Sequence, residues 1–134
     1  RYTDTVDPTE ACIQALRSSG YKIAVTSPRV DGYKAHCLPI DQPVALVMGT
    51  EFKGASERML EAADYHVFIP MLGMAESLNI SVAAGMIMHR IMENMRALPR
   101  ETWQLSADEK EALLLDWAMK SVKKSDAILK HQGL

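Results

Sequence analysis

Apolar runs of strand length alternate with amphipathic segments along this chain. The runs lie at residues 21–26, 44–48 and 65–69. The segments 9–19, 56–63 and 79–95 have the apolar spacing of helices. Because strands that alternate with helices form parallel sheets, the pattern predicts an α/β domain with a mostly parallel sheet and helices on both faces.

Local signals refine these elements. Asp7 and Pro8 are typical of a helix start, and Gly20 of a helix end. The run at 44–48 is apolar without a break, which predicts a strand covered on both faces. The loop between the first two runs contains four prolines or glycines, and we expect a short extended piece at 35–38.

The segment 79–95 predicts the longest helix of this part. It is apolar on nearly every face between Ile80 and Met88, so we expect burial on more than one side. Ser81 and Gly85 lie one turn apart and would let another backbone come close. Two interpretations stay open, an inter-subunit contact and a central core helix. Asn79 is expected to cap this helix.

The chain ends in a second helical pattern with a basic tail. Ser106 and Glu109 form a capping-box signature, which predicts a helix from about residue 107. Residues 119–134 contain four lysines against one aspartate. These cations fit either a solvated helix end or phosphate contacts with a nucleic acid. They are Lys120, Lys123, Lys124 and Lys130, followed by His131.

Composition restricts the classes of function. The net charge of −2 gives no global sign of nucleic-acid binding. Cys12 and Cys37 make neither a disulfide framework nor a zinc site, and His36 beside Cys37 lacks a second ligand cluster, so we expect no metal and a reducing, cytoplasmic setting. No apolar run approaches 18 residues and no signal peptide is present, so we expect a soluble protein without a membrane partner.

Three loops leave carboxyl ends of the predicted strands, where open parallel sheets bind ligands. They begin at Thr26, Gly49 and Met71. Gly49 and Gly54 have the spacing of a phosphate loop, but Ala55 follows where that loop needs lysine, which excludes a nucleotide hydrolase of that type. The sequence also argues against a serine hydrolase, because no G-x-S-x-G occurs and Ser77 has no nearby His or Asp.

Two of these three loops, the ones that begin at Gly49 and Met71, are apolar, and their polar groups are Glu51, Ser77 and Asn79. Such a site suits an adenine ring and a sulfonium methionine better than a triphosphate, because a cluster of cations is missing. The stretches "VALVMGTEFKGAS" (44–56) and "VFIPMLGMAESLNISVAAGMIMH" (67–89) resemble the second and third signature motifs of the SpoU-type RNA ribose 2′-O-methyltransferases of the SPOUT superfamily, and TrmH-like tRNA (guanosine-2′-O-)-methyltransferases above all. The resemblance extends more weakly through "ALRSSGYKIAVTSP" and "LSADEKEALLLDWA".

The resemblance implies a deep C-terminal trefoil knot that binds S-adenosyl-L-methionine, a homodimer, and an RNA substrate. Because of the C-terminal helical extension, tRNA is favoured over ribosomal RNA. It implies catalytic roles for Glu51, Asn79 and Ser77. It also implies a cofactor pocket lined by Thr26, Gly49, Ile69, Met71 and Leu78.

One signature of the family is missing from this sequence. The first motif, whose arginine activates the 2′-hydroxyl, has no match around Arg1, Arg17 or Arg29. We therefore expect residues 1–98 to be a methyltransferase domain without its N-terminal part, and residues 99–134 to be the helical extension. Two alternatives stay open: a ribosomal RNA 2′-O-methyltransferase, and a non-catalytic dimer that binds S-adenosylmethionine or RNA.

Overall fold

The computed structural model describes residues 7–28, 31–74 and 77–122. The chain divides into two compact units, residues 1–97 and residues 98–134. Each unit is described by itself.

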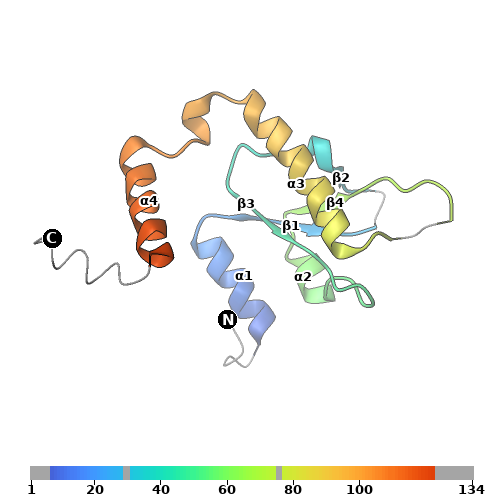
Figure 1. The fold of residues 1–134 in the computed structure, drawn as a ribbon. Coiled ribbons are helices and arrows are strands. Elements are labelled where there is room, and N and C mark those ends of the chain that lie inside the picture. Colours follow the sequence, from blue (N-terminus) through green and yellow to red (C-terminus); the bar gives the residue numbers. More distant parts are fainter. Residues whose placement is uncertain (1–6, 29–30, 75–76, 123–134) are drawn as a thin grey trace, which may run out of the picture. The chain divides into compact units, whose positions relative to one another are not determined.

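The first unit is built on a four-stranded sheet in the order β2-β4-β1-β3. Every pairing between these strands is parallel, which confirms the predicted α/β class with a parallel sheet. β4, the last strand in the described part of the chain, lies between β1 and β2, although β1 and β2 follow each other in sequence (Figure 1). The strands are β1 (Lys22–Thr26), β2 (Tyr33–Lys34), β3 (Val44–Val47) and β4 (Tyr65–Phe68).

The connection from β1 to β2 approaches β4 closely at Gly32. A Cβ atom at Gly32 would lie 2.6 Å from the carbonyl oxygen of His66 in β4. Real Cβ contacts of that length do not occur, so only glycine lets this segment lie against the β4 backbone.

Helices cover both faces of the sheet, because neighbouring residues of a strand point to opposite sides. Ile23 and Val25 of β1 are buried against α1 (Pro8–Ser18) and α2 (Glu57–Glu61). Ala24, between them, lies in a second cluster with Ile87 of α3 (Ile80–Ala97). The start of α1 is as predicted, since the Asp7 side chain accepts hydrogen bonds from the amides of Thr9 and Glu10, at 3.0 and 3.1 Å.

The expected extended piece at 35–38 is wrong. The strand β2 ends at Lys34, directly before this segment, and is followed by a 3₁₀ turn, η1 (Ala35–Cys37). Ala35 and Leu38 are both buried beneath α3, whereas Cys37 is exposed. Spacing of three residues puts side chains on one face of a 3₁₀ turn, while a strand would have put residues 35 and 37 together.

β3 is present as predicted, but its burial is only partial. We expected both faces of β3 to be covered. Val47 packs against the cluster under α1 and α2, and Val44 and Leu46 pack against the cluster beneath α3, yet all four residues of the strand stay partly exposed. In the described part of the chain, β3 pairs with β1 alone and forms an edge of the sheet. β3 is therefore more apolar than the partial burial of its side chains at this edge position requires.

The second unit contains η2 (Arg100–Thr102) and α4 (Ala107–Ser121). The predicted capping box is present: the Ser106 hydroxyl accepts from the Glu109 amide at 3.2 Å, and the Glu109 carboxylate accepts from the Ser106 amide at 2.9 Å. Lys120 pairs with Asp116 one turn earlier, at 2.6 Å. The other basic residues of the tail, Lys123, Lys124, Lys130 and His131, lie outside the described residues. Among the described helices, none is long and apolar enough to cross a membrane.

Candidate functional site

The carboxyl ends of β1, β3 and β4 meet at one edge of the sheet. Thr26 is in register with Val67, and Val25 with Val47, so the three strands end within two residues of one another. The loops that follow therefore emerge side by side. This edge brings together the three segments that carry the predicted site residues.

Thr26 and Gly49 are in direct contact at this edge. The Gly49 amide donates a hydrogen bond to the Thr26 hydroxyl at 3.2 Å, and this bond ties the end of β1 to the loop after β3. A Cβ atom at Gly49 would lie 2.6 Å from both the amide nitrogen of Ala55 and the carbonyl carbon of Gly54. The returning backbone of the loop thus occupies the space that any side chain at Gly49 would need.

The loop between β3 and α2 closes on itself. Thr50 and Gly54 exchange two backbone hydrogen bonds of 3.0 and 2.9 Å. The Thr50 hydroxyl also accepts from the Lys53 amide at 3.3 Å. Gly54 has a φ of 66°, a left-handed conformation that favours glycine. These bonds hold Glu51, Phe52 and Lys53 at the tip of a short, internally bonded loop.

A hydrogen bond joins Glu51 and Asn79 at the carboxyl ends of the strands. The Asn79 amide nitrogen donates to the Glu51 carboxylate at 3.1 Å. The amide oxygen of Asn79 accepts from the Ser81 amide at 2.9 Å, so Asn79 caps α3 as predicted. One side chain therefore starts the helix and orients the carboxylate. Both side chains remain exposed to solvent.

The other predicted residues lie on the segment between β4 and α3. Ile69 packs against the core cluster beneath α3. Met71 and Leu78 are partly buried, and Ser77 is exposed two residues before Asn79. The structure thus joins two pairs of the predicted set by hydrogen bonds and places Ser77, Met71 and Leu78 on the adjoining loop.

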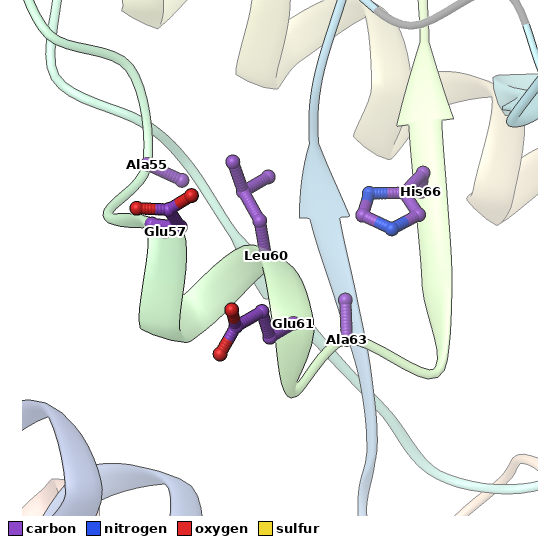
Figure 2. Close-up of a pocket in the computed structure, with 6 residues that line it drawn as sticks. All are labelled: Ala55, Glu57, Leu60, Glu61, Ala63 and His66. Carbon is purple, nitrogen blue, oxygen red and sulfur yellow. The ribbon is translucent and has the colours of Figure 1, made fainter.

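A cavity of about 480 Å³ lies elsewhere, between α2 and β4. Figure 2 shows His66 on β4 facing the α2 side, with Leu60 and Glu61 on the helix. The Nδ1 atom of His66 is buried without a hydrogen-bond partner in the described part of the chain. None of the predicted site residues lines this cavity, which is formed by Ala55, Glu57, Leu60, Glu61, Ala63 and His66.

Strong electrostatic contacts lie away from the loops. Asp64 accepts hydrogen bonds from the Ile23 amide at 2.9 Å and from the Lys22 ammonium at 3.2 Å. Burial raises the pKa of the Asp64 carboxyl, but these donors outweigh it and leave the pKa below its usual range. Arg17 donates to the carbonyl of Ala62 at 3.0 Å. These contacts stabilise the opposite end of the sheet.

Two features of the site escaped the sequence analysis. The exposed Phe52 was passed over because a single aromatic residue in a loop carries no periodic signal. The self-closing bonds of Thr50 were also missed, although its hydroxyl four residues before Gly54 is typical of a short turn.

Among the described residues, no group of three His, Cys, Asp or Glu side chains is arranged to hold a metal ion.

Comparisons with known proteins confirm the resemblance. The model of the SpoU rRNA Methylase family matches residues 2–89. A tRNA (guanosine(18)-2′-O)-methyltransferase of Borreliella burgdorferi is 36% identical over 111 residues, which cover 83% of this chain and 50% of the relative. The chain therefore spans about half the length of this curated relative.

Solved structures agree with the fold. The TrmH/SpoU tRNA modifying enzyme of A. aeolicus is 31% identical, with a TM-score of 0.69 over 89% of this chain and 61% of that one. The SpoU methyltransferase AviRb of Streptomyces viridochromogenes, solved in complex with the cofactor AdoMet, is 28% identical, with a TM-score of 0.57 over 71% of this chain and 37% of that one. The match to the family model includes both motifs that meet at the carboxyl ends of the strands, and the chain belongs to the SpoU rRNA Methylase family.

Proposed function

We propose that this chain is the cofactor-binding part of an RNA ribose 2′-O-methyltransferase that uses S-adenosyl-L-methionine and acts on tRNA. The observation that carries this proposal is the hydrogen bond between Asn79 and Glu51, which joins the two family motifs at the carboxyl edge of the sheet. The names of the Borreliella relative and of the A. aeolicus enzyme support tRNA as the substrate.

The residues at the edge fit the proposed cofactor. Bound S-adenosylmethionine supplies an electrophilic methyl group. The hydrogen bond from the Gly49 amide to the Thr26 hydroxyl fixes the backbone on one side of the proposed pocket. Ile69, Met71 and Leu78 offer partly buried apolar surface for an adenosine moiety. The complex of AviRb with AdoMet supports this assignment, because AviRb has the same fold over most of this chain.

Glu51, Asn79 and Ser77 are proposed to orient the target ribose. Transfer to a 2′-oxygen requires that the hydroxyl point at the methyl carbon and lose its proton. The Asn79 amide holds one carboxylate oxygen of Glu51, which leaves the other able to accept from a ribose hydroxyl. Ser77, two residues before Asn79, adds a second polar group for the same ribose.

A knotted backbone is part of this proposal. It is supported by the sheet order, because β4 lies between β1 and β2, and by Gly32, which packs against the β4 backbone. This order places β4 beside the segment that connects β1 to β2, which is the arrangement that threading of the chain past that segment requires. We likewise propose that residues 1–98 form the methyltransferase domain and that residues 99–134 form a helical extension.

The proposed protein is a homodimer that pairs through α3. Within one chain, Ile87 is the residue of α3 that is fully buried. Val82, Met86, Met88 and Met92 are 39–51% exposed, and Gly85 on the same helix has nothing within 4 Å of a built Cβ atom. Exposed methionines around an uncovered glycine suit close packing of a second helix.

Two narrower alternatives remain. A ribosomal RNA substrate is favoured by the description of the family itself. A non-catalytic binder is favoured by the contacts of Arg17, Arg58 and Arg90, because they are bound to Ala62, Glu10 and Glu93 and not to Glu51. A cytoplasmic setting is part of the same proposal and is supported by the free thiols of Cys12 and Cys37.

Titration calorimetry with S-adenosylhomocysteine tests the cofactor site, and transfer of a labelled methyl group to unmodified tRNA tests the reaction. We expect the wild-type chain to bind S-adenosylhomocysteine. Where methyl transfer is measured, it should be lost in Glu51→Gln and kept in Glu57→Gln, the same change on the surface of α2. Binding without transfer to any RNA would select the non-catalytic alternative. Transfer to ribosomal RNA alone would select the other. A folded chain that does not bind S-adenosylhomocysteine would refute the proposal.

A further inference from the structure

Phe52 is an aromatic side chain with no cover in the described part of the chain. It is 97% exposed and lies between Thr50 and Gly54, in the loop that joins β3 to α2. The loop is closed by the bonds between Thr50 and Gly54, so the backbone at Phe52 is held in place. An internally bonded loop thus presents one large ring to solvent.

The position of Phe52 relates it to the proposed site. It directly follows Glu51, whose carboxylate is bound by Asn79. Consecutive Cα atoms are about 3.8 Å apart. A ribose that contacts Glu51 would therefore have its own base, or an adjacent one, within reach of the Phe52 ring.

The residues beside Phe52 distinguish between two kinds of partner. Protein interfaces have few charged residues at their cores, yet Phe52 lies between Glu51 and Lys53. An aromatic ring next to a lysine suits a single-stranded nucleic acid, because the ring stacks on a base and the ammonium meets a phosphate. RNA is therefore the partner that this arrangement fits.

We propose that Phe52 is a stacking platform for a base of the RNA substrate, at or next to the nucleotide whose ribose reaches Glu51, and that Lys53 contacts the neighbouring phosphate. This inference rests on the proposed function, since it takes RNA as the ligand. It adds a residue that orients the substrate without touching the reacting atoms.

The test measures binding of unmodified tRNA to the full chain and to Phe52 variants, by fluorescence anisotropy. Loss of stacking in Phe52→Ala and Phe52→Leu should weaken binding about five- to fifty-fold, whereas Phe52→Tyr should stay within about two-fold of wild type. Lys53→Gln should reduce the slope of log K against log salt by about one. Affinity for S-adenosylhomocysteine should be unchanged in all four variants, and it controls for folding.

Three results would overturn the proposal: wild-type affinity in Phe52→Ala, wild-type affinity in Phe52→Leu, or a change in self-association in place of RNA binding. A wild-type chain that does not bind tRNA would overturn it as well. The outcome is separable from that of the proposed function. A chain that binds RNA without transferring methyl groups would refute the enzyme, while the Phe52 variants would still decide the stacking role.

Discussion

The Asn79 side chain donates to Glu51 at 3.1 Å and, with its oxygen, caps α3 through the Ser81 amide at 2.9 Å. Residues 28 positions apart in the sequence are thus joined by one amide group. The same group has a structural role and a proposed functional role, and variants of Asn79 can separate the two.

We predict that Asn79→Ser separates capping from activity. Serine caps helices nearly as well as asparagine, so the free energy of unfolding should stay close to that of wild type. Its shorter side chain does not reach Glu51, and loss of a hydrogen bond to a charged group should reduce methyl transfer about ten-fold or more. Urea denaturation and a transfer assay under matched conditions check both expectations.

Asn79→Ala serves as the control for this comparison. It removes the cap as well, and should lower the free energy of unfolding by about 1 kcal/mol while losing the same transfer activity. Equal stability of the two variants would contradict the capping role. Full activity of either would contradict the role in the reaction.

A side chain at Gly49 should displace the loop that follows β3. The alanine Cβ would lie 2.6 Å from the backbone at Ala55, and a clash with backbone cannot be relieved by rotating a side chain. We expect Gly49→Ala to lower the free energy of unfolding by about 1–3 kcal/mol and to weaken binding of S-adenosylhomocysteine. Chemical denaturation and calorimetry measure the two effects.

Gly20→Ala is the matched control for Gly49→Ala. Gly20 has a φ of 79° at the end of α1, so alanine there is strained by about 1 kcal/mol without a steric clash. It should lower stability and leave cofactor affinity unchanged. A similar loss of affinity in both variants would mean that Gly49 acts through general stability and not through the loop.

Gly85→Ala distinguishes a free α3 surface from a paired one. In a single chain, alanine would meet nothing within 4 Å and would stabilise the helix by up to about 1 kcal/mol. In the proposed dimer the same methyl group would separate the two helices and weaken association. We predict a higher dissociation constant by sedimentation equilibrium. An increase in melting temperature without any change in association would contradict pairing at Gly85.

Much of the fold follows from local signals in the sequence. The helix that starts after Asp7 and the one that starts after Ser106 begin where their capping residues predict, because capping is decided within four residues. The burial of β3 was not predictable in this way. An apolar run such as Val44–Val47 is compatible with burial on both faces. How much of it is buried depends on residues far along the chain that pack against it.

In the site, too, the residues could be predicted from the sequence, but their contacts depend on the fold. Glu51 and Asn79 could be selected from the motifs, but their hydrogen bond depends on the strand order, which brings together loops that are separate in sequence. Gly49 was selected as a cofactor residue, whereas the closeness of Ala55 and Gly54 to it is visible only in the folded loop. Phe52 is a single aromatic residue in its loop, so no periodic pattern identifies it, and its exposure is known only from the structure.

Asp64 should stabilise the fold in a pH-dependent way. Its carboxylate, which accepts from the Ile23 amide and pairs with Lys22, has a folded-state pKa below its usual range. A lowered folded-state pKa gives stability that is fully present above the unfolded pKa of about 3.9 and is lost as the pH falls through the folded value. Asp64→Asn should therefore lower the free energy of unfolding by about 1 kcal/mol at pH 7, a value reduced for the partial exposure of the pair.

The pH at which the Asp64 effect disappears tests its origin. The contribution of the Asp64 carboxylate begins to fall below the unfolded pKa of about 3.9 and is fully lost only below the lowered folded-state pKa, so the difference in stability between the two proteins should shrink as the pH is lowered to about 3. Urea denaturation at pH 7, 5 and 3 measures this convergence. Asp116→Asn is the control, because Asp116 pairs with Lys120 on an exposed surface of α4 and should change stability by no more than about 0.5 kcal/mol at pH 7. A difference between wild type and Asp64→Asn that persists unchanged at pH 3 would show that the substitution acts through packing and not through the charge of the carboxylate.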